Sequence, residues 1–221
     1  MNKPKICASL VSADTGAIKE ITPLVDFFEV RIDLIGAGWQ ELAKLLKKPW
    51  IACNRSAKEG GRAATPEDIR VSELLKAIEP GAGIVDIELS TGKLARVVPL
   101  IKRKAQCLIS HHDTERTPPP GELKKIVEDE LNAGADICKV VTTANSFDDN
   151  MVTVQLIKEF PEAKLVSFCM GKTGQVSRIL CPIVGGYFTY ASTGKGKESA
   201  PGQMTIVELR KLYDIGYCHE N

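Results

Sequence analysis

Short apolar runs rich in β-branched residues recur along the chain, and stretches in which apolar residues follow a helical spacing separate them. The runs predict eight strands, at residues 5–10, 27–33, 50–55, 83–89, 106–111, 136–141, 164–170 and 185–191. The intervening stretches predict helices, for example at 39–48, 65–79, 91–104 and 119–134. The helix at 65 opens with Thr65-Pro66-Glu67, which predicts a cap, a first-turn proline and a first-turn acid. Gly134 predicts the end of the last of these helices.

The alternation of strands and helices, at spacings of roughly 20 to 30 residues, indicates a parallel α/β protein. A closed (β/α)8 barrel and a doubly wound open sheet both fit, and the count of eight favours the barrel, although 221 residues is compact for one. The segment "SLVSADTG" after the first strand is not a dinucleotide fingerprint, and "MGKTG" (170–174) lacks the upstream glycine of a phosphate loop. Nothing resembles an interdomain linker. We therefore expect one (β/α)8 TIM barrel domain over residues 1–221.

Composition and charge limit the classes of partner. Hydrophobic residues make up 43% of the chain, which supports a substantial core. The 29 basic and 28 acidic residues leave a net charge of +1, so we expect no general attraction for nucleic acid or a membrane surface, only local binding of a small anion. The N-terminal "MNKPKICASL" lacks a signal-peptide pattern and no apolar run approaches membrane-spanning length, which predicts a soluble, cytoplasmic protein.

Cysteine usage fits the same compartment. The seven cysteines are an odd number and include no C-x-x-C pair. Four of them, at positions 7, 107, 138 and 169, lie inside apolar runs, where a thiol packs as a small hydrophobe. We expect buried, reduced thiols rather than a disulfide framework or a metal centre.

Several predicted strands carry charged residues where a strand covered on both faces should be apolar. Glu29 and Arg31 are two residues apart in one strand and so share a face, Arg55 ends the next strand, and Lys139 interrupts the run "ICKVV". Each alone could be a solvated strand end or a snorkelling side chain. In a barrel, however, the carboxyl ends of the strands converge on one mouth. Their joint occurrence predicts an active site there.

Lys139 is the most informative of these residues. A lysine within the run 137–141 loses hydration, which predicts a lowered pKa and a neutral amine able to attack a carbonyl and form a Schiff base. The alternative is that it points outward between helices, or pairs permanently with a carboxylate such as Glu29.

Two adjacent histidines, His111 and His112, end the fifth predicted strand. Because side chains alternate along a strand, only one of them can face the barrel interior. The third histidine, His219, lies in the C-terminal tail. Metal binding is therefore disfavoured, and one histidine as a general acid/base of near-neutral pKa, with its neighbour a bystander, is the better interpretation.

The last third of the chain supplies candidates for binding an anion. Arg178 follows the seventh strand in "KTGQVSRIL". The loop "STGKGKESAPGQ" (192–203) places Ser199 and Gln203 on either side of Pro201-Gly202. At the mouth of a barrel such a loop suits a mobile lid, although it also reads as an ordinary exposed turn.

Together these residues resemble the type I 3-dehydroquinate dehydratases, Schiff-base enzymes of the shikimate pathway and aromatic amino acid biosynthesis. The resemblance spans essentially the whole chain, through the motifs "EVRID", "CNRSAKEGG", "SHHD", "CKVV", "SFCMGKTGQVSR" and "ESAPGQ". Six ordered motifs at the ends of predicted strands make it specific. It implies a cytoplasmic lyase, a homodimer, that dehydrates 3-dehydroquinate to 3-dehydroshikimate without metal, nucleotide or prosthetic group.

The resemblance also implies a role for each site residue. Lys139 would form an imine with the substrate ketone. His112 would be the general acid/base for the syn elimination of water, and Glu59 would orient it. Arg178 would bind the substrate carboxylate. The remaining expected substrate-binding residues would engage hydroxyls (Glu29, Arg31, Arg55 and Ser9), close over the substrate (Ser199 and Gln203) or line the pocket (Phe168, Met170 and Tyr190).

Two other functions fit part of the pattern. Another class I Schiff-base barrel, such as an aldolase, would share the lysine, but commonly binds phosphorylated substrates after the last two strands. Here that region offers Arg178 and the "SAPGQ" loop, which suit a carboxylate better. A non-catalytic metabolite-binding barrel would explain an anion site but not a buried lysine accompanied by a histidine.

Overall fold

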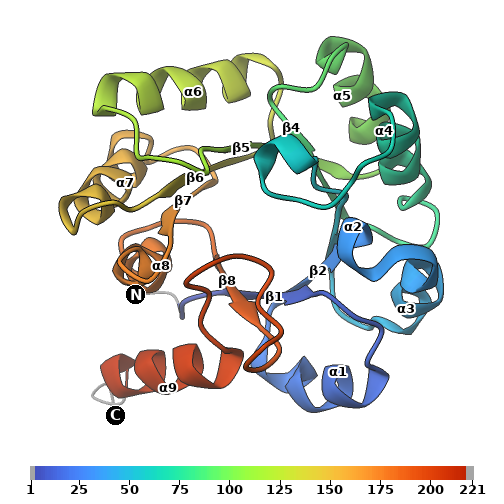
Figure 1. Cartoon of the computed structure of the whole chain (residues 1–221), viewed down its shortest axis with the longest axis horizontal. Helices are drawn as coiled ribbons and strands as arrows, with labels where there is room; N and C mark the ends of the chain where they lie inside the picture. The colour runs from blue at the N-terminus through green and yellow to red at the C-terminus, as the bar shows by residue number, and fades with distance from the viewer. Residues whose placement is uncertain (1–2, 218–221) are drawn as a thin grey trace.

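A computed structural model describes residues 3–217, which form a ring of parallel strands enclosed by helices (Figure 1). The strands belong to one eight-stranded sheet of order β7-β6-β5-β4-β3-β2-β1-β8. Their bounds are β1 Ile6–Leu10, β2 Phe27–Arg31, β3 Trp50–Cys53, β4 Ile84–Glu88, β5 Gln106–His112, β6 Ile137–Thr143, β7 Leu165–Met170 and β8 Thr189–Ser192.

The connections between strands carry the helices. The α-helices are α1 Thr15–Ile21, α2 Ile32–Ile35, α3 Trp39–Leu45, α4 Glu67–Lys76, α5 Leu94–Lys102, α6 Pro120–Asn132, α7 Asp148–Glu159, α8 Gln175–Ile183 and α9 Ile206–Tyr217. Short 3-10 turns occur at Thr22–Leu24, Gly36–Gly38 and Ala57–Glu59. Figure 1 shows the longer helices arranged around the outside of the strands, as right-handed strand–helix–strand units require.

The ring of strands is nearly closed. Consecutive strands from β1 to β7 pair in parallel, and β8 pairs with β1. Between the two ends of the sheet, the Tyr187 amide donates a hydrogen bond of 2.8 Å to the Leu165 carbonyl. The predicted (β/α)8 barrel is confirmed, and each predicted strand overlaps the observed one.

Some local details differ from the prediction. Arg55 lies two residues beyond β3, which ends at Cys53. Thr65 is not a cap, because α4 begins at Glu67 and Pro66 itself occupies the position before the helix, without a side-chain cap. Gly134 ends α6 as expected, with a φ of +97° that favours glycine.

Alternation along the strands separates two environments. The outward-facing residues, such as Val85, Ile109 and Val140, are apolar and pack against the helices. Inward-facing residues near the carboxyl ends of the strands are polar, and they form the site described below. The six cysteines among the described residues are buried and unpaired, whereas Cys218 and His219 lie outside them. No helix within residues 3–217 is long and apolar enough to cross a bilayer.

Candidate active site

A cavity of about 350 Å³ opens at the carboxyl ends of the strands. Its position is the one at which (β/α)8 barrels hold catalytic groups, because side chains from many strands converge there. All the site residues expected from the sequence line it, namely Ser9, Glu29, Arg31, Arg55, Glu59, His112, Lys139, Phe168, Met170, Arg178, Tyr190, Ser199 and Gln203. Side chains that are distant in sequence therefore share one enclosed space.

Lys139 points from β6 into the barrel and is only 5% exposed. Its Nζ lies 3.0 Å from Asp86 Oδ2 and 3.6 Å from Glu29 Oε1. It also lies 4.2 Å from the centre of the Tyr190 ring, an arrangement that favours a cation. The outward-pointing alternative is therefore wrong, whereas pairing with Glu29 is present and accompanied by a shorter pair with Asp86.

The expectation of a lowered pKa for Lys139 is also wrong for the protein without substrate. Burial lowers the pKa, but the carboxylates of Asp86 and Glu29 raise it by more, so that the net shift is upward. The amine is consequently protonated at neutral pH and must lose a proton before it can act as a nucleophile.

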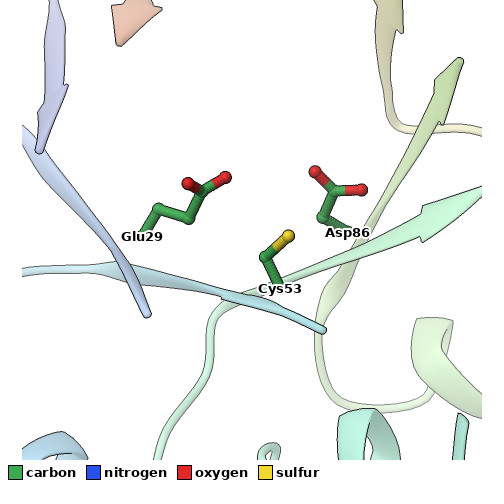
Figure 2. A group of neighbouring side chains, drawn as sticks. All are labelled: Glu29, Cys53 and Asp86. Carbon is green, nitrogen blue, oxygen red and sulfur yellow. The ribbon is translucent and has the colours of Figure 1, made fainter. Parts of the chain in front are cut away.

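Figure 2 shows Glu29, Cys53 and Asp86, on β2, β3 and β4, pointing toward a common space. One ligand-type atom from each lies within 4.8 Å of the others, which is a spacing compatible with a metal ion. The donor set fits a metal poorly, however. Asp86 is already paired with Arg55 and Lys139, and Glu29 lies 3.6 Å from the same lysine nitrogen. Burial raises the pKa of the Cys53 thiol far above its usual value, so the sulfur keeps its proton.

His112 is the histidine that faces the cavity, as strand alternation predicts for one of the pair. Glu59 Oε2 lies 3.0 Å from both the backbone nitrogen and Nδ1 of His112. A carboxylate accepting both hydrogen bonds places the ring proton on Nδ1 and leaves Nε2 with a free lone pair. Ser90 Oγ donates to the other oxygen of Glu59 at 2.8 Å and holds the carboxylate in place.

The protonation of this pair differs from the near-neutral pKa expected of the histidine. Burial lowers the pKa of His112 well below its usual value, and the nearby charges of Arg55 and Lys139 lower it further. Burial also raises the pKa of Glu59, against the opposing effect of Arg55. The imidazole is therefore neutral at physiological pH and able to accept a proton.

Arg178, on α8, is a buried guanidinium without an acidic partner among residues 3–217. It stacks over the Phe168 ring at 4.5 Å and donates to the Pro201 carbonyl at 3.3 Å, while its Nε finds no acceptor within that range. Burial lowers its pKa to about 10. A buried cation with unused donors indicates a site for an anionic group.

The other two arginines of the cavity are held by acids. Arg31 makes a two-pronged contact with Asp33, at 2.9 and 2.7 Å. Arg55 contacts Asp86 at 2.7 Å and Glu88 at 3.1 Å. These pairs fix the two guanidinium groups at the cavity wall, so they present oriented N–H groups with little net charge.

The loop after β8 covers the cavity. Within it, the Ser199 amide and hydroxyl donate to Gln203 Oε1 at 2.8 and 3.2 Å. The Gly171 amide donates to the Pro201 carbonyl at 3.1 Å. A side chain at Gly202 would lie 2.0 Å from the Gly171 carbonyl oxygen, so glycine is required where the loop meets the end of β7. The loop therefore lines the cavity through residues 199–201 and Gln203, and its movement as a lid stays a prediction.

Two buried acids behind the cavity wall, Asp86 and Glu88, were not predicted from the sequence, and Ser110 was noted only as a polar residue near the end of its strand. Asp86 and Glu88 occupy alternate positions in "GIVDIEL", which is the same signal that singled out Glu29 and Arg31. Ser110 connects Asp86 to Arg55, since it donates to Asp86 at 2.6 Å and accepts from Arg55 at 2.8 Å, and Glu88 contacts Arg55 directly at 3.1 Å. Charged residues two apart in a buried strand could have revealed the first two.

Comparisons with known proteins agree with this geometry. Residues 6–219 match the family model described as type I 3-dehydroquinase. The 3-dehydroquinate dehydratase of Dehalococcoides mccartyi is 42% identical over 213 residues, covering 96% of both chains. That of Methanocaldococcus jannaschii is 37% identical over 196 residues, covering 87% of this chain and 88% of the other. The crystal structure of 3-dehydroquinate dehydratase from Geobacillus kaustophilus superposes with a TM-score of 0.87 at 25% identity, covering 100% and 93% of the two chains.

Proposed function

The chain belongs to the type I 3-dehydroquinase family, and from this premise we propose how its side chains dehydrate 3-dehydroquinate to 3-dehydroshikimate. Its activity is that of a hydro-lyase, with the Schiff-base chemistry typical of the family. The aldolase-like and non-catalytic alternatives lose their support, because the relatives that match nearly the whole chain are dehydratases.

Lys139 provides the covalent step. After losing a proton, its amine attacks the substrate ketone and forms an imine with the loss of water. The protonated imine withdraws electrons from the neighbouring carbon and makes its C–H bond acidic. This electron sink forms from the substrate and the lysine themselves, so we propose that the reaction needs no metal, nucleotide or prosthetic group.

His112 provides the proton transfers. Its neutral Nε2 removes the proton next to the imine, giving an enamine, and the resulting imidazolium returns the proton to the departing hydroxyl. Water then hydrolyses the product imine, which releases 3-dehydroshikimate and regenerates the Lys139 amine. One base acting on both groups fits a syn elimination. Glu59 holds the ring in the required tautomer and stabilises the imidazolium while it exists.

Arg178 binds the substrate carboxylate and thereby orients the ring. The unpaired guanidinium can form two parallel hydrogen bonds to a carboxylate, and the enclosed site strengthens them. Ser199 and Gln203 close the lid above the substrate, while Phe168, Met170 and Tyr190 form the apolar wall. Glu29, Arg31, Arg55 and Ser9 face the substrate hydroxyls.

We propose further that the protein is a cytoplasmic homodimer whose partner in the reaction is the small-molecule substrate, as the family resemblance implies. Light scattering on the purified protein measures the oligomeric state directly. A mass of one chain at micromolar concentration would contradict the dimer without affecting the chemistry.

One observation carries the assignment of roles: the buried amine of Lys139 and the free Nε2 of His112 open onto the same cavity as an unpaired arginine. Treatment with sodium borohydride in the presence of 3-dehydroquinate should therefore trap one covalent adduct per chain, at Lys139. Peptide mass spectrometry locates the label. Label on another residue, or no label while the enzyme turns over, would contradict the imine.

Replacing Arg178 by methionine should separate activity from stability. Because the guanidinium is buried without an acidic partner in the part of the chain that the structure describes, the free protein should keep or slightly raise its melting temperature. The value of kcat/KM should fall by about 10²-fold, since charge-assisted hydrogen bonds to the carboxylate are lost. Steady-state kinetics and thermal unfolding measure the two effects.

Arg178→Lys is the matched variant for this prediction. It keeps the positive charge but loses the planar fork, so it should recover only part of kcat/KM. Unchanged kinetics in Arg178→Met would show that the carboxylate binds elsewhere.

A further inference from the structure

Asp86 lies beneath the floor of the cavity, on the far side of the Lys139 amine. It is 1% exposed and does not line the cavity, whereas both Lys139 and Glu29 do. Asp86 therefore lies behind the lining residues, in contact with the nitrogens of Lys139 and Arg55. This placement separates Asp86 from the residues that bind substrate directly.

The contacts of Asp86 hold it in a fixed orientation. One carboxylate oxygen, Oδ2, lies 2.7 Å from Arg55 Nη2 and 3.0 Å from Lys139 Nζ. The other, Oδ1, accepts a hydrogen bond of 2.6 Å from Ser110. Burial alone would raise the pKa of Asp86, but Arg55 and Lys139 lower it by more, so the group stays ionised.

Glu29 is the other acid near the lysine, and its contacts differ. It lies 3.6 Å from Nζ, and its second oxygen accepts a hydrogen bond from Ser9. Glu29 borders the cavity, where a substrate hydroxyl can compete for it. Of the two acids, Asp86 is the one whose contact with the lysine nitrogen survives when substrate enters.

We propose that Asp86 is the catalytic counter-ion of the Lys139 nitrogen, paired with it as an ammonium before the reaction and as an iminium during it. This inference rests on the proposed function, because it requires Lys139 to form the imine. It assigns to Asp86 the stabilisation of the covalent intermediate, separately from substrate binding.

The step balances in protons and charge. The ammonium transfers one proton to Asp86 Oδ2, and the freed lone pair forms the C–N bond while the carbonyl π pair moves to oxygen. Asp86 returns its proton to the nitrogen, and neutral His112, which lines the cavity, passes two of the nitrogen's protons in turn to that oxygen, which leaves as water. The third proton stays on the iminium nitrogen. Asp86 thus faces one positive charge on the nitrogen both in the ammonium and in the iminium, and its carboxylate can keep the same position in both states.

The charge of the lysine nitrogen depends on every group that faces it. Asp86 and Glu29 raise the pKa of Lys139 against its burial, and Arg55 opposes them. The other charged, titratable or aromatic groups around this nitrogen are Cys7, Cys53, His112 and Tyr190. Removing the charge of Asp86 leaves burial and Arg55 opposed by Glu29 alone, so the pKa of Lys139 falls.

Asp86→Asn and Glu29→Gln form a matched pair for the test, because each removes one negative charge beside the same nitrogen with little change of shape. Asp86→Asn should lower kcat by about 10²-fold, the scale reported for losing one preorganised electrostatic contact. The rate of borohydride trapping with 3-dehydroquinate is followed as a function of pH. The pH at which this rate begins to rise should be lower in Asp86→Asn than in the wild type. Glu29→Gln should shift this profile less.

Binding of an unreactive analogue, in which the ketone is replaced by a hydroxyl, separates the two acids further. Calorimetry should give nearly the wild-type dissociation constant for Asp86→Asn, because Glu88 and Ser110 still hold Arg55. Glu29→Gln should bind the analogue more weakly. A folded Asp86→Asn with wild-type kcat and trapping profile would overturn the proposal, and so would equal profiles for the two variants.

The wild-type protein gives a test that does not depend on the variant folding. Modification of Lys139 by methyl acetimidate, followed by mass spectrometry, requires the neutral amine. Its rate should keep rising through the alkaline range, and a plateau at or below neutral pH would overturn the role of Asp86. Failure of wild-type trapping at Lys139 would instead reject the proposed function, so the two failures are distinguishable.

Discussion

Replacing Lys139 by methionine should reduce kcat for 3-dehydroquinate by about 10⁵-fold or more, since loss of a covalent nucleophile is among the most damaging changes an active site can undergo. Methionine matches the length and apolar character of the lysine stem, so it fills the same space between Tyr190 and the floor of the cavity. Borohydride should trap no adduct. Steady-state kinetics and intact-protein mass spectrometry measure both effects.

The same substitution should destabilise the free protein, because it removes one partner of a buried ion pair. Losing a partner from such a pair costs about 3–5 kcal/mol where the remaining charge is left alone. Here Arg55 still lies 2.7 Å from Asp86, so the loss of unfolding free energy should be below that range. Chemical denaturation of the two proteins at neutral pH measures it.

The stability difference should depend on pH in a defined direction. The pKa of Lys139 is raised in the folded protein, so its ion pair stabilises the fold below the ordinary lysine pKa and loses that effect as pH rises through the folded value. The pKa of Asp86 is lowered, so its contribution is present above the ordinary aspartate pKa and is lost on acidification. The gap between wild type and Lys139→Met should therefore be greatest near neutral pH.

Lys139→Arg is the control that separates charge from covalent chemistry. It keeps a cation beside Asp86 and Glu29 but cannot form an imine, because the guanidinium does not deprotonate in proteins. Its activity should be as low as that of Lys139→Met, while more of the stability is retained. Measurable dehydration by either variant above the uncatalysed rate would point to a mechanism without the imine.

The sequence predicted the barrel because its signals are local. Runs such as 137–141 are apolar and β-branched, and helices such as 119–134 carry a 3.6-residue period and a terminal glycine, so each element could be located from its own residues. Thr65 shows the limit of local signals. A threonine before a proline resembles a helix cap, but the proline itself became the residue before the helix.

The site was predictable where a residue broke the pattern of its own strand. Lys139 and Glu29 stood out as charges in apolar runs, and strand alternation required that only one histidine of the pair face inward. Which of the two faces inward came from the family resemblance, and the structure places His112 on the cavity side.

The protonation states could not be predicted in this way, because they depend on residues distant in sequence. Burial of Lys139 was visible in its own strand, but the acid that reverses its effect, Asp86, is 53 positions away. The pKa of His112 is lowered first by burial and then by Arg55 and Lys139, which belong to other parts of the ring. These charged groups become neighbours only when the strands of the barrel come together, so their effect on the pKa values cannot be seen in any one segment of the sequence.

His112→Ala should lower kcat by between about 10² and 10⁴-fold, the range expected for a general acid/base, while leaving imine formation intact. The covalent step belongs to Lys139, so borohydride should still trap the substrate adduct. Because dehydration becomes slow, the trapped species should be the adduct before water loss. Mass spectrometry distinguishes it from the dehydrated adduct by the mass of one water.

His111→Ala is the matched control, because it removes the same ring from the adjacent residue. His111 does not line the cavity, and neither Glu59 nor Lys139 contacts it, so kcat should change by no more than a few-fold. Two outcomes would contradict the assignment. Equal losses in both variants would mean that the end of β5 presents both side chains to the reaction, and a larger loss in His111→Ala would mean that the register of these two residues is reversed. The two variants should differ because adjacent residues of a strand point to opposite faces, so only His112 faces the cavity. Glu59 also hydrogen-bonds to His112 and holds its ring in place.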